Sequence, residues 1–198
     1  MTNTSATGGF LQERNGPLLI EVLEDIWHDV LAGITGIGAK LVRPSRQINP
    51  TRQPKPGVDW IAFEIVRAYG DPVPYVRHDS TDDGKDIVID HQRYSIRAAC
   101  YGSHSDDTAG KIKRGLWVWQ NRSLLRKAGI ALQIVDDPQT VPEIDGETWI
   151  QRTDIEAVFV VETRGDYAVL NLLRARGQIA SDSGIENNFD TNEEALHG

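Results

Sequence analysis

The chain has 198 residues, of which 39% are hydrophobic and 25% are charged, and its formal net charge is −8. These values are typical of one globular domain with a substantial core, and no apolar run approaches the roughly 20 residues of a membrane-spanning helix. The acidic balance excludes a duplex-DNA-binding protein of the basic-patch class.

The N-terminal residues lack the basic stretch and apolar run of a secretory signal, so we expect synthesis inside the cell. The single cysteine, Cys100, cannot form an internal disulfide. It lies inside a predicted strand, where a thiol is expected to pack as a small buried apolar group and not to react.

Residues 1–16 are polar and Gly-rich and predict a flexible arm. Pro17 is suited to the first position of a helix. An apolar stripe then predicts an amphipathic helix, with its inward residues at Leu19, Leu23, Ile26, Val30 and Ile34. His28 falls on the opposite, solvated face. Glycines at 33, 36 and 38 end the helix, and they do not form a phosphate-binding loop because no Gly-Lys-Ser/Thr follows.

A short strand at 41–43 precedes a long loop, residues 44–57, that contains four prolines. Proline favours an extended, partly stiff backbone, and the loop is long for a connection within a compact domain. It is either a surface loop without further role or an arm that touches a neighbouring subunit. For the second case the candidate contact residues are Arg46, Arg52, Pro54, Lys55 and Pro56.

Alternating apolar residues predict a strand at 60–69, a continuation of the sheet at 75–78 and a long strand at 86–101. The alternation changes phase near His91 and Gln92, which indicates a bend or bulge. The acidic loop before this strand resembles a calcium loop only in part, since Lys85 occupies a ligand position and the final Glu is missing. Asp79, Asp83, Asp90 and His91 could alternatively form a nuclease metal site, but their spacing gives no support.

A helical block is predicted at 105–128, with Ser105 as the N-cap. Its apolar stripe consists of Ala109, Ile112, Leu116 and Trp119, and Leu125 is also expected to pack in the subunit. Trp117 lies about 100° around the helix from Leu116 and is therefore a candidate partner contact. Gly129 is predicted to end the helix in the left-handed conformation, before a strand at 130–135.

Asp145–Gly146 predicts a hairpin turn, followed by a strand at 148–162, a turn at 163–166 and a returning strand at 167–173. Residues 177–198 form a tail, and its segment 181–198 carries five of the eight net negative charges. That tail is either a solvated end or an arm that docks on a partner. The whole predicts a single α+β domain at 17–176, with a mostly antiparallel, mixed sheet flanked by helices.

Several short motifs together carry a family resemblance. They are Leu23-Glu-Asp-Ile-Trp27, Leu41-Val-Arg-Pro44, Gly57-Val-Asp-Trp60, Tyr101-Gly102, Gln120-Asn-Arg122 with Leu125, Ala128-Gly-Ile130, and Arg152 with Asp154. In this order and spacing, from about Pro17 to Leu173, the chain resembles the phage neck terminator family, which is itself similar to tail terminators of long-tailed phages.

The resemblance implies a tail-terminator-like fold and a structural virion protein without an active site or cofactor. Such proteins form a ring, usually of six subunits, that closes the tail tube and joins it to the head connector below the portal. The implied partners are further copies of the chain, connector or adaptor proteins, and tail-tube or sheath proteins. Genomic DNA passes through the lumen without sequence-specific binding, and no membrane is involved.

Two functions from other classes remain open at the level of the sequence. One is a metal-dependent nuclease, which would bind divalent metal. The other is a monomeric intracellular binding module for a peptide or small molecule, which would differ from a ring in its mass in solution.

Overall fold

The computed structural model describes residues 3–14, 16, 20–47, 52–55, 57–145, 148–180 and 186–192. Only the backbone is described at 67–69, 145, 148, 174–180 and 186–192. The predicted helix start at Pro17 and the inward Leu19 lie outside the described residues. So do Pro56 and the turn residue Gly146.

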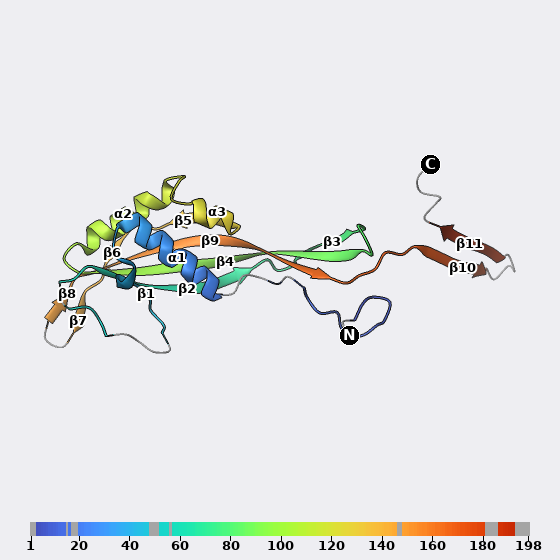
Figure 1. Cartoon of the computed structure of the whole chain (residues 1–198), viewed down its shortest axis with the longest axis horizontal. Coiled ribbons are helices and arrows are strands. Elements are labelled where there is room, and N and C mark those ends of the chain that lie inside the picture. Colours follow the sequence, from blue (N-terminus) through green and yellow to red (C-terminus); the bar gives the residue numbers. More distant parts are fainter. Residues whose placement is uncertain are drawn as a thin grey trace. The chain divides into compact units, whose positions relative to one another are not determined.

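The described elements, in chain order, are α1 (Ile20–Thr35), the 3-10 turn η1 (Ala39–Leu41), β1 (Val42–Pro44), β2 (Trp60–Gly70), β3 (Tyr75–Asp79), β4 (Lys85–Tyr101), α2 (Ser105–Trp117), α3 (Ser123–Lys127), β5 (Ile130–Val135), β6 (Gln139–Thr140), β7 (Glu143–Asp145), β8 (Thr148–Ile150), β9 (Arg152–Tyr167), β10 (Arg174–Ala180) and β11 (Glu186–Asn192) (Figure 1). None of these helices has both the length and the apolar character that a bilayer span requires.

The main sheet has the strand order β1-β2-β4-β9-β5, with β3 paired to β4 and β6 paired to β9. The β1–β2 pairing is parallel, whereas β2–β4, β5–β9 and β6–β9 are antiparallel. The α+β class with a mixed, mostly antiparallel sheet is therefore confirmed. The irregularity expected near His91 lies on the neighbouring strand, because the β2–β4 register shifts between Arg67 and Tyr69.

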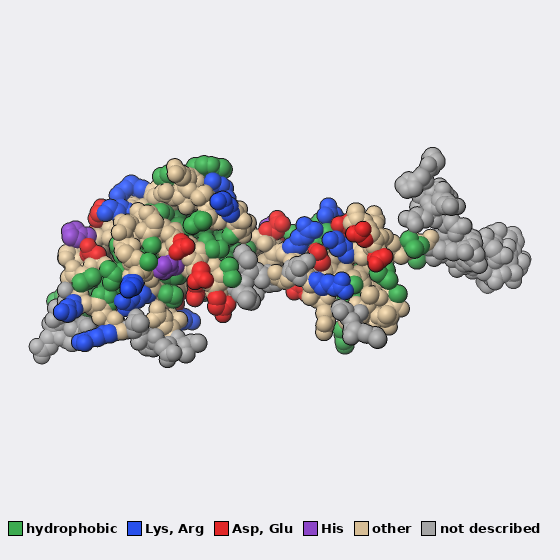
Figure 2. Space-filling model, in the orientation of Figure 1, with side chains coloured by type: hydrophobic (Ala, Val, Ile, Leu, Met, Phe, Trp, Pro, Cys, Tyr) green, Lys and Arg blue, Asp and Glu red, His purple; other side chains and the backbone are tan. Residues whose placement is uncertain are grey.

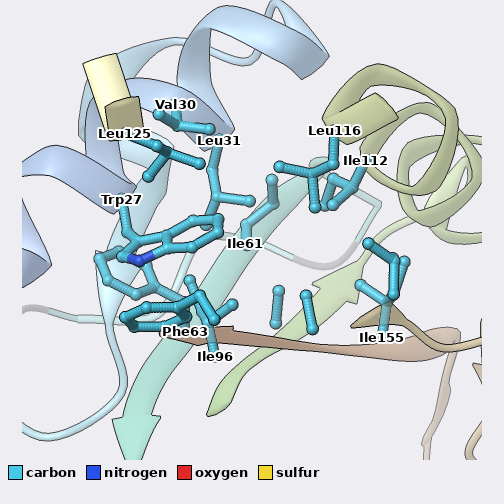
Figure 3. Close-up of a cluster of buried hydrophobic side chains, with 14 of the residues drawn as sticks. Trp27, Val30, Leu31, Ile61, Phe63, Ile96, Ile112, Leu116, Leu125 and Ile155 are labelled. Atoms are coloured by element: carbon cyan, nitrogen blue, oxygen red, sulfur yellow. The ribbon is translucent and has the colours of Figure 1, made fainter. Parts of the chain in front are cut away.

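The chain divides into two compact units. The larger, residues 16–75 and 89–164, contains the three helices and the hydrophobic core. In Figure 3, the core side chains of α1, α2 and α3 meet those of β2, β4 and β9. Trp27 is the largest of them, fully buried, with its ring 5.1 Å from that of Phe159.

The α1 stripe is largely as predicted, because Leu23 and Val30 are buried and Ile26 and Ile34 pack partly against the core. The sequence interpretation omitted Trp27 from this stripe, although it lies four residues after Leu23. His28, expected on the solvated face, is half-buried and contacts the backbone carbonyl of Ala39 at 3.0 Å.

Two predictions for the helical block at 105–128 were wrong, one at its end and one at its start. Because α2 ends at Trp117, the stripe Ala109, Ile112 and Leu116 is buried but Trp119 is 67% exposed. Ser105 is the first helical residue and not the N-cap, and its hydroxyl accepts a hydrogen bond from Thr153. Gly129 has φ +72°, as the left-handed helix end predicted.

The smaller unit comprises residues 1–15, 76–88 and 165–198. Asn171 is its central hydrogen-bonding residue, because its amide donates to the carbonyls of Ser80 and Asp82 and its backbone N–H donates to Asp83. Residues 3–14, assigned by sequence to a flexible arm, include Arg14, which exchanges two backbone hydrogen bonds with Asp166.

The C-terminal strands differ from the prediction. β9 continues to Tyr167, so the turn expected at 163–166 is absent from this described part, and residues 168–173 form no strand. Instead β10 and β11 pair antiparallel, with Arg174 opposite Asn192 and Ala180 opposite Glu186. The sequence missed these strands because their residues are polar and do not alternate with apolar ones.

Candidate functional site

A groove of about 700 Å³ lies in the surface of the larger unit. Three segments form it: the end of the proline-containing loop, the adjoining ends of β2 and β4, and the β7–β8 hairpin. We call it the loop groove, and its lining residues are Arg52, Gln53, Pro54, Lys55, Gly57, Val58, Trp60, Tyr101, Gly102, Ser103, Glu143, Ile144, Trp149, Ile150 and Gln151.

Aromatic rings form the wall of the loop groove on the main sheet. Trp60 and Tyr101 are paired across β2 and β4, and their rings stack with centroids 4.3 Å apart and planes 8° from parallel. The guanidinium of Arg152 lies 5.6 Å from the Tyr101 ring. Burial raises the pKa of the Tyr101 hydroxyl, so this side chain stays neutral at physiological pH.

The β7–β8 hairpin forms the opposite wall, and it presents apolar side chains to solvent. Trp149 is 69% exposed, and Ile144, its partner in register, is also exposed. Arg152 fixes this hairpin to β9, because its guanidinium donates to both carboxylate oxygens of Asp154, at 2.7 and 2.8 Å, and to Glu143 at 2.8 Å. These bonds raise the pKa of Arg152, the bond to Asp154 most of all.

The end of the loop groove near β4 is a constrained turn. Gly102 has φ +104°, and a Cβ there would lie 2.3 Å from a carboxylate oxygen of Asp59, so only glycine fits. The same carboxylate accepts a hydrogen bond from the backbone N–H of His104 and contacts its ring at 2.8 Å. This turn is therefore held in one conformation beside the groove.

Hydrogen bonds hold the described part of the proline-containing loop. Arg43 donates through Nη1 to the carbonyl of Arg52 at 3.0 Å and through Nε to that of Lys40. The backbone N–H of Val58 donates to Lys55. No local pattern predicts order in this loop, because these bonds join residues nine and three positions apart without any periodicity.

Of the candidate contact residues, the structure brings together Arg52, Pro54 and Lys55, which all line the loop groove. Arg46 is not among them: its side chain is 85% exposed and pairs with Glu64 at 3.2 Å. Trp117 lies elsewhere, at the end of α2, and is half exposed, in accord with its predicted position off the core face. The partner-binding role of all these residues stays a prediction.

A second exposed surface lies at the turn between α2 and α3, and we call it the tryptophan turn. Trp117, Val118, Trp119 and Leu124 are exposed there. The guanidinium of Arg126 lies 3.6 Å from the Trp119 ring centroid, and that of Arg122 lies near both tryptophans. Residues 108–135 contain six Lys or Arg and no acid, and Figure 2 shows Lys and Arg side chains beside hydrophobic ones over α2 and α3.

The face of the main sheet opposite the helices is polar. A shallow hollow of about 330 Å³ is lined by charged residues of β2, β4 and β9. Arg97 lies 3.1 Å from Glu156 and 3.9 Å from Glu64, which also pairs with Arg46. Acidic side chains outnumber the two arginines in its lining, so the hollow is not suited to an anion.

The residues weighed for a metal site have separate partners. His91 contacts Asp71 at 3.0 Å, Asp79 accepts from the Thr81 hydroxyl, and Asp90 accepts from the Gln92 amide at 3.1 Å. Among the described residues, no group of three or more His, Cys, Asp or Glu could hold a metal ion. Cys100 is fully buried, and burial raises the pKa of its thiol to about 12, so it is the inert packing residue that the sequence predicted.

The fold is α+β, and each of these two exposed surfaces combines aromatic with basic side chains. The family model for phage neck terminator proteins matches residues 21–183, and the chain therefore belongs to this family. It is a structural protein of the phage neck and is located in the virion. No curated protein matches the chain.

Proposed function

We propose that the protein assembles into a ring of six subunits that closes the tail tube and joins it to the head connector. The observation that carries this proposal is the match of the neck terminator family over residues 21–183, which covers most of the chain. Its partners in this role are connector or adaptor proteins on one side and tail-tube or sheath proteins on the other. Assembly takes place in the host cytoplasm, and no membrane takes part.

A ring of identical subunits requires two different surfaces that fit each other, because each contact is head-to-tail. The larger unit has two exposed surfaces that support contacts with other chains, the loop groove and the tryptophan turn, because exposed aromatic residues beside arginine are frequent anchors of interfaces. Residues 1–16, the loop 44–57 and the tail 177–198 are the segments that we assign to contacts beyond the subunit.

In this role the protein performs no chemical step. DNA passes through the ring lumen, and the net charge of −8 favours transit over tight binding because phosphates are repelled by an acidic chain. His91→Ala and Asp83→Ala should therefore leave head-to-tail joining intact. An assembly assay in which divalent metal restores function to the parent but not to these variants would contradict this assignment.

The ring itself is tested by native mass spectrometry and electron microscopy of the purified full chain. A closed six-membered ring is expected. Trp117→Ala should have a large effect on the fraction of subunits found in rings and a smaller effect on the melting temperature, because Trp117 is half exposed at the tryptophan turn. A strictly monomeric parent at micromolar concentration and in particles would favour the binding-module alternative and reject the ring.

The proline-containing loop is tested in assembling phage. Replacement of residues 46–57 by a short Gly-Ser turn should leave a folded, soluble subunit but leave tails unjoined to heads. A stiff basic arm loses little entropy on docking, and its charges accelerate association with an acidic neighbour. Normal joining without the loop would remove it from the mechanism.

A further inference from the structure

The C-terminal segment contains the strands β10 and β11, and the question is what else in the assembly they contact. Its strands β10 and β11 pair only with each other among the described strands. A two-stranded hairpin on its own is marginally stable in water, so further contacts are needed to hold it. Residues 181–198 include five acidic side chains and no Lys or Arg, which predicts a basic binding surface for this segment.

The loop groove has the complementary composition. Arg52 and Lys55 lie on its rim and are exposed, while its one acidic lining residue, Glu143, is already paired with Arg152 at 2.8 Å. Trp149 and Ile144, which line the same groove and are exposed, offer apolar contacts. A volume of about 700 Å³ accommodates several side chains, which is the size of a site for a short peptide segment.

We propose that the acidic C-terminal segment of one copy, residues 186–198, binds in the loop groove of the next copy in the ring. This segment places apolar residues directly beside acids, with Phe189 before Asp190 and Leu196 shortly after Glu193 and Glu194. The apolar side chains contact Trp149 and Ile144, and the acids pair with Arg52 and Lys55. The inference rests on the proposed ring and names one of its head-to-tail contacts.

The groove and the segment are different surfaces of the same chain, so every copy can donate one and accept the other, as a closed ring requires. The tryptophan turn is a weaker candidate for this segment. There the Trp119 ring is already covered by the guanidinium of Arg126 at 3.6 Å.

Cysteine cross-linking of the full chain tests the contact. Gln53→Cys in the groove is combined with Asn192→Cys in the tail, and the native Cys100 does not compete because it is fully buried. Mild oxidation should give a ladder of covalent oligomers on a non-reducing gel. Gln133→Cys, an exposed position on β5, replaces Gln53→Cys in the control and should give no ladder. A disulfide formed only within one chain would overturn the proposal.

A second experiment reverses the charges that the proposal pairs. Arg52→Glu with Lys55→Glu should abolish the ladder, and Glu193→Lys with Glu194→Lys in the same chain should restore it. Arg126→Glu at the tryptophan turn is the matched control and should leave the ladder unchanged. Loss of the ladder with Arg126→Glu but not with the groove variants would place the segment on the other surface and overturn the proposal.

Native mass spectrometry before oxidation separates the two levels of inference. If the cysteine variant forms rings of the same size as the parent but gives no ladder, the proposed tail contact is wrong and the ring stands. A monomeric parent would reject the ring and the tail contact together. Circular dichroism of each variant verifies folding, which is expected to be unchanged because all substituted groove positions are exposed.

Discussion

On β4, Ile96, Ala98 and Cys100 point into the core beneath the helices, whereas Arg97 lies on the uncovered side among Glu64 and Glu156. The same alternation holds on β9, where Ile155 and Phe159 are buried and Asp154 takes part in an ion pair. One face of the sheet thus stabilises the fold by burial. The opposite face carries paired charges and adjoins the loop groove, which contains the exposed Trp149.

The tryptophans of the chain differ in the same way, and they do not share one role. Trp27 is fully buried against Phe159, whereas Trp119 and Trp149 are mostly exposed. Burial of a large ring contributes several kcal/mol to the free energy of unfolding, while an exposed ring contributes little to it. The exposed rings are consequently available for contacts with other chains.

The largest expected effect comes from the covered face. Trp27→Ala should lower the free energy of unfolding by about 3–5 kcal/mol, because it removes a fully buried ring and leaves a cavity. Trp119→Ala is the matched control and should change it by less than about 1 kcal/mol. Urea titration followed by circular dichroism measures both. Equal losses in the two variants would remove the distinction between buried and exposed tryptophans.

On the uncovered face, Arg152→Met should lower the free energy of unfolding by about 1–3 kcal/mol, because Asp154 and Glu143 both lose a charge-assisted hydrogen bond. Arg97→Met is the comparison, since Arg97 is more exposed and its pairs are longer. It should cost below about 1 kcal/mol. Thermal unfolding ranks the two, and a reversed ranking would show that the β7–β8 hairpin does not depend on Arg152.

The two glycines of α2 should respond in opposite directions. A Cβ at Gly115 would lie 2.4 Å from a methyl carbon of Ile34 on α1, so Gly115→Ala should destabilise the fold by about 1–3 kcal/mol. At Gly110 the nearest atom is the flexible end of Arg114. Gly110→Ala should therefore raise the free energy of unfolding, by at most about 1 kcal/mol, through helix propensity. Stabilisation by Gly115→Ala would mean that α1 and α2 pack less closely.

The smallest effect concerns pH. The hydrogen bond to the Ala39 carbonyl, with a further contribution from Asp29, raises the pKa of His28. Its charged form is therefore favoured in the folded state, and this stabilisation is complete below about pH 6.5 and is lost as pH rises through the folded value.

His28→Gln should reduce the difference in unfolding free energy between pH 5.5 and pH 8.5 by less than about 1 kcal/mol, as expected for a partly exposed pair. Because Gln can donate to the Ala39 carbonyl at either pH, the variant retains the hydrogen bond without titrating. An NMR titration of the parent gives the pKa directly, and a value at or below about 6.5 would refute the assignment.

Local patterns predicted much of the larger unit. The strands at 60–69, 86–101 and 130–135 were placed within one residue or matched, and Gly129 ends its helix as expected, because alternation and positive φ are properties of a short stretch of chain. The end of α2 at Trp117 was missed. Helical spacing continues through Trp119, and no residue type in that stretch marks the stop.

The candidate site was predictable only in part. The proline-rich composition indicated the loop, and three of its candidate residues line the groove. The turn signal at Asp145–Gly146 predicted a hairpin near Ile144 and Trp149 but not its place beside the loop, which depends on the bonds of Arg152 that hold the hairpin to β9. That position depends on contacts between segments roughly a hundred residues apart.

The alternation of the strands, the apolar stripe of α1 and the acidic composition of the tail could be read from the sequence alone, since each is a property of neighbouring residues. The identity of the buried tryptophans, and the position of Arg52 and Lys55 in one groove with Trp149, follow from the packed fold alone. The physical reason is that burial depends on packing of the whole core, which no local pattern specifies.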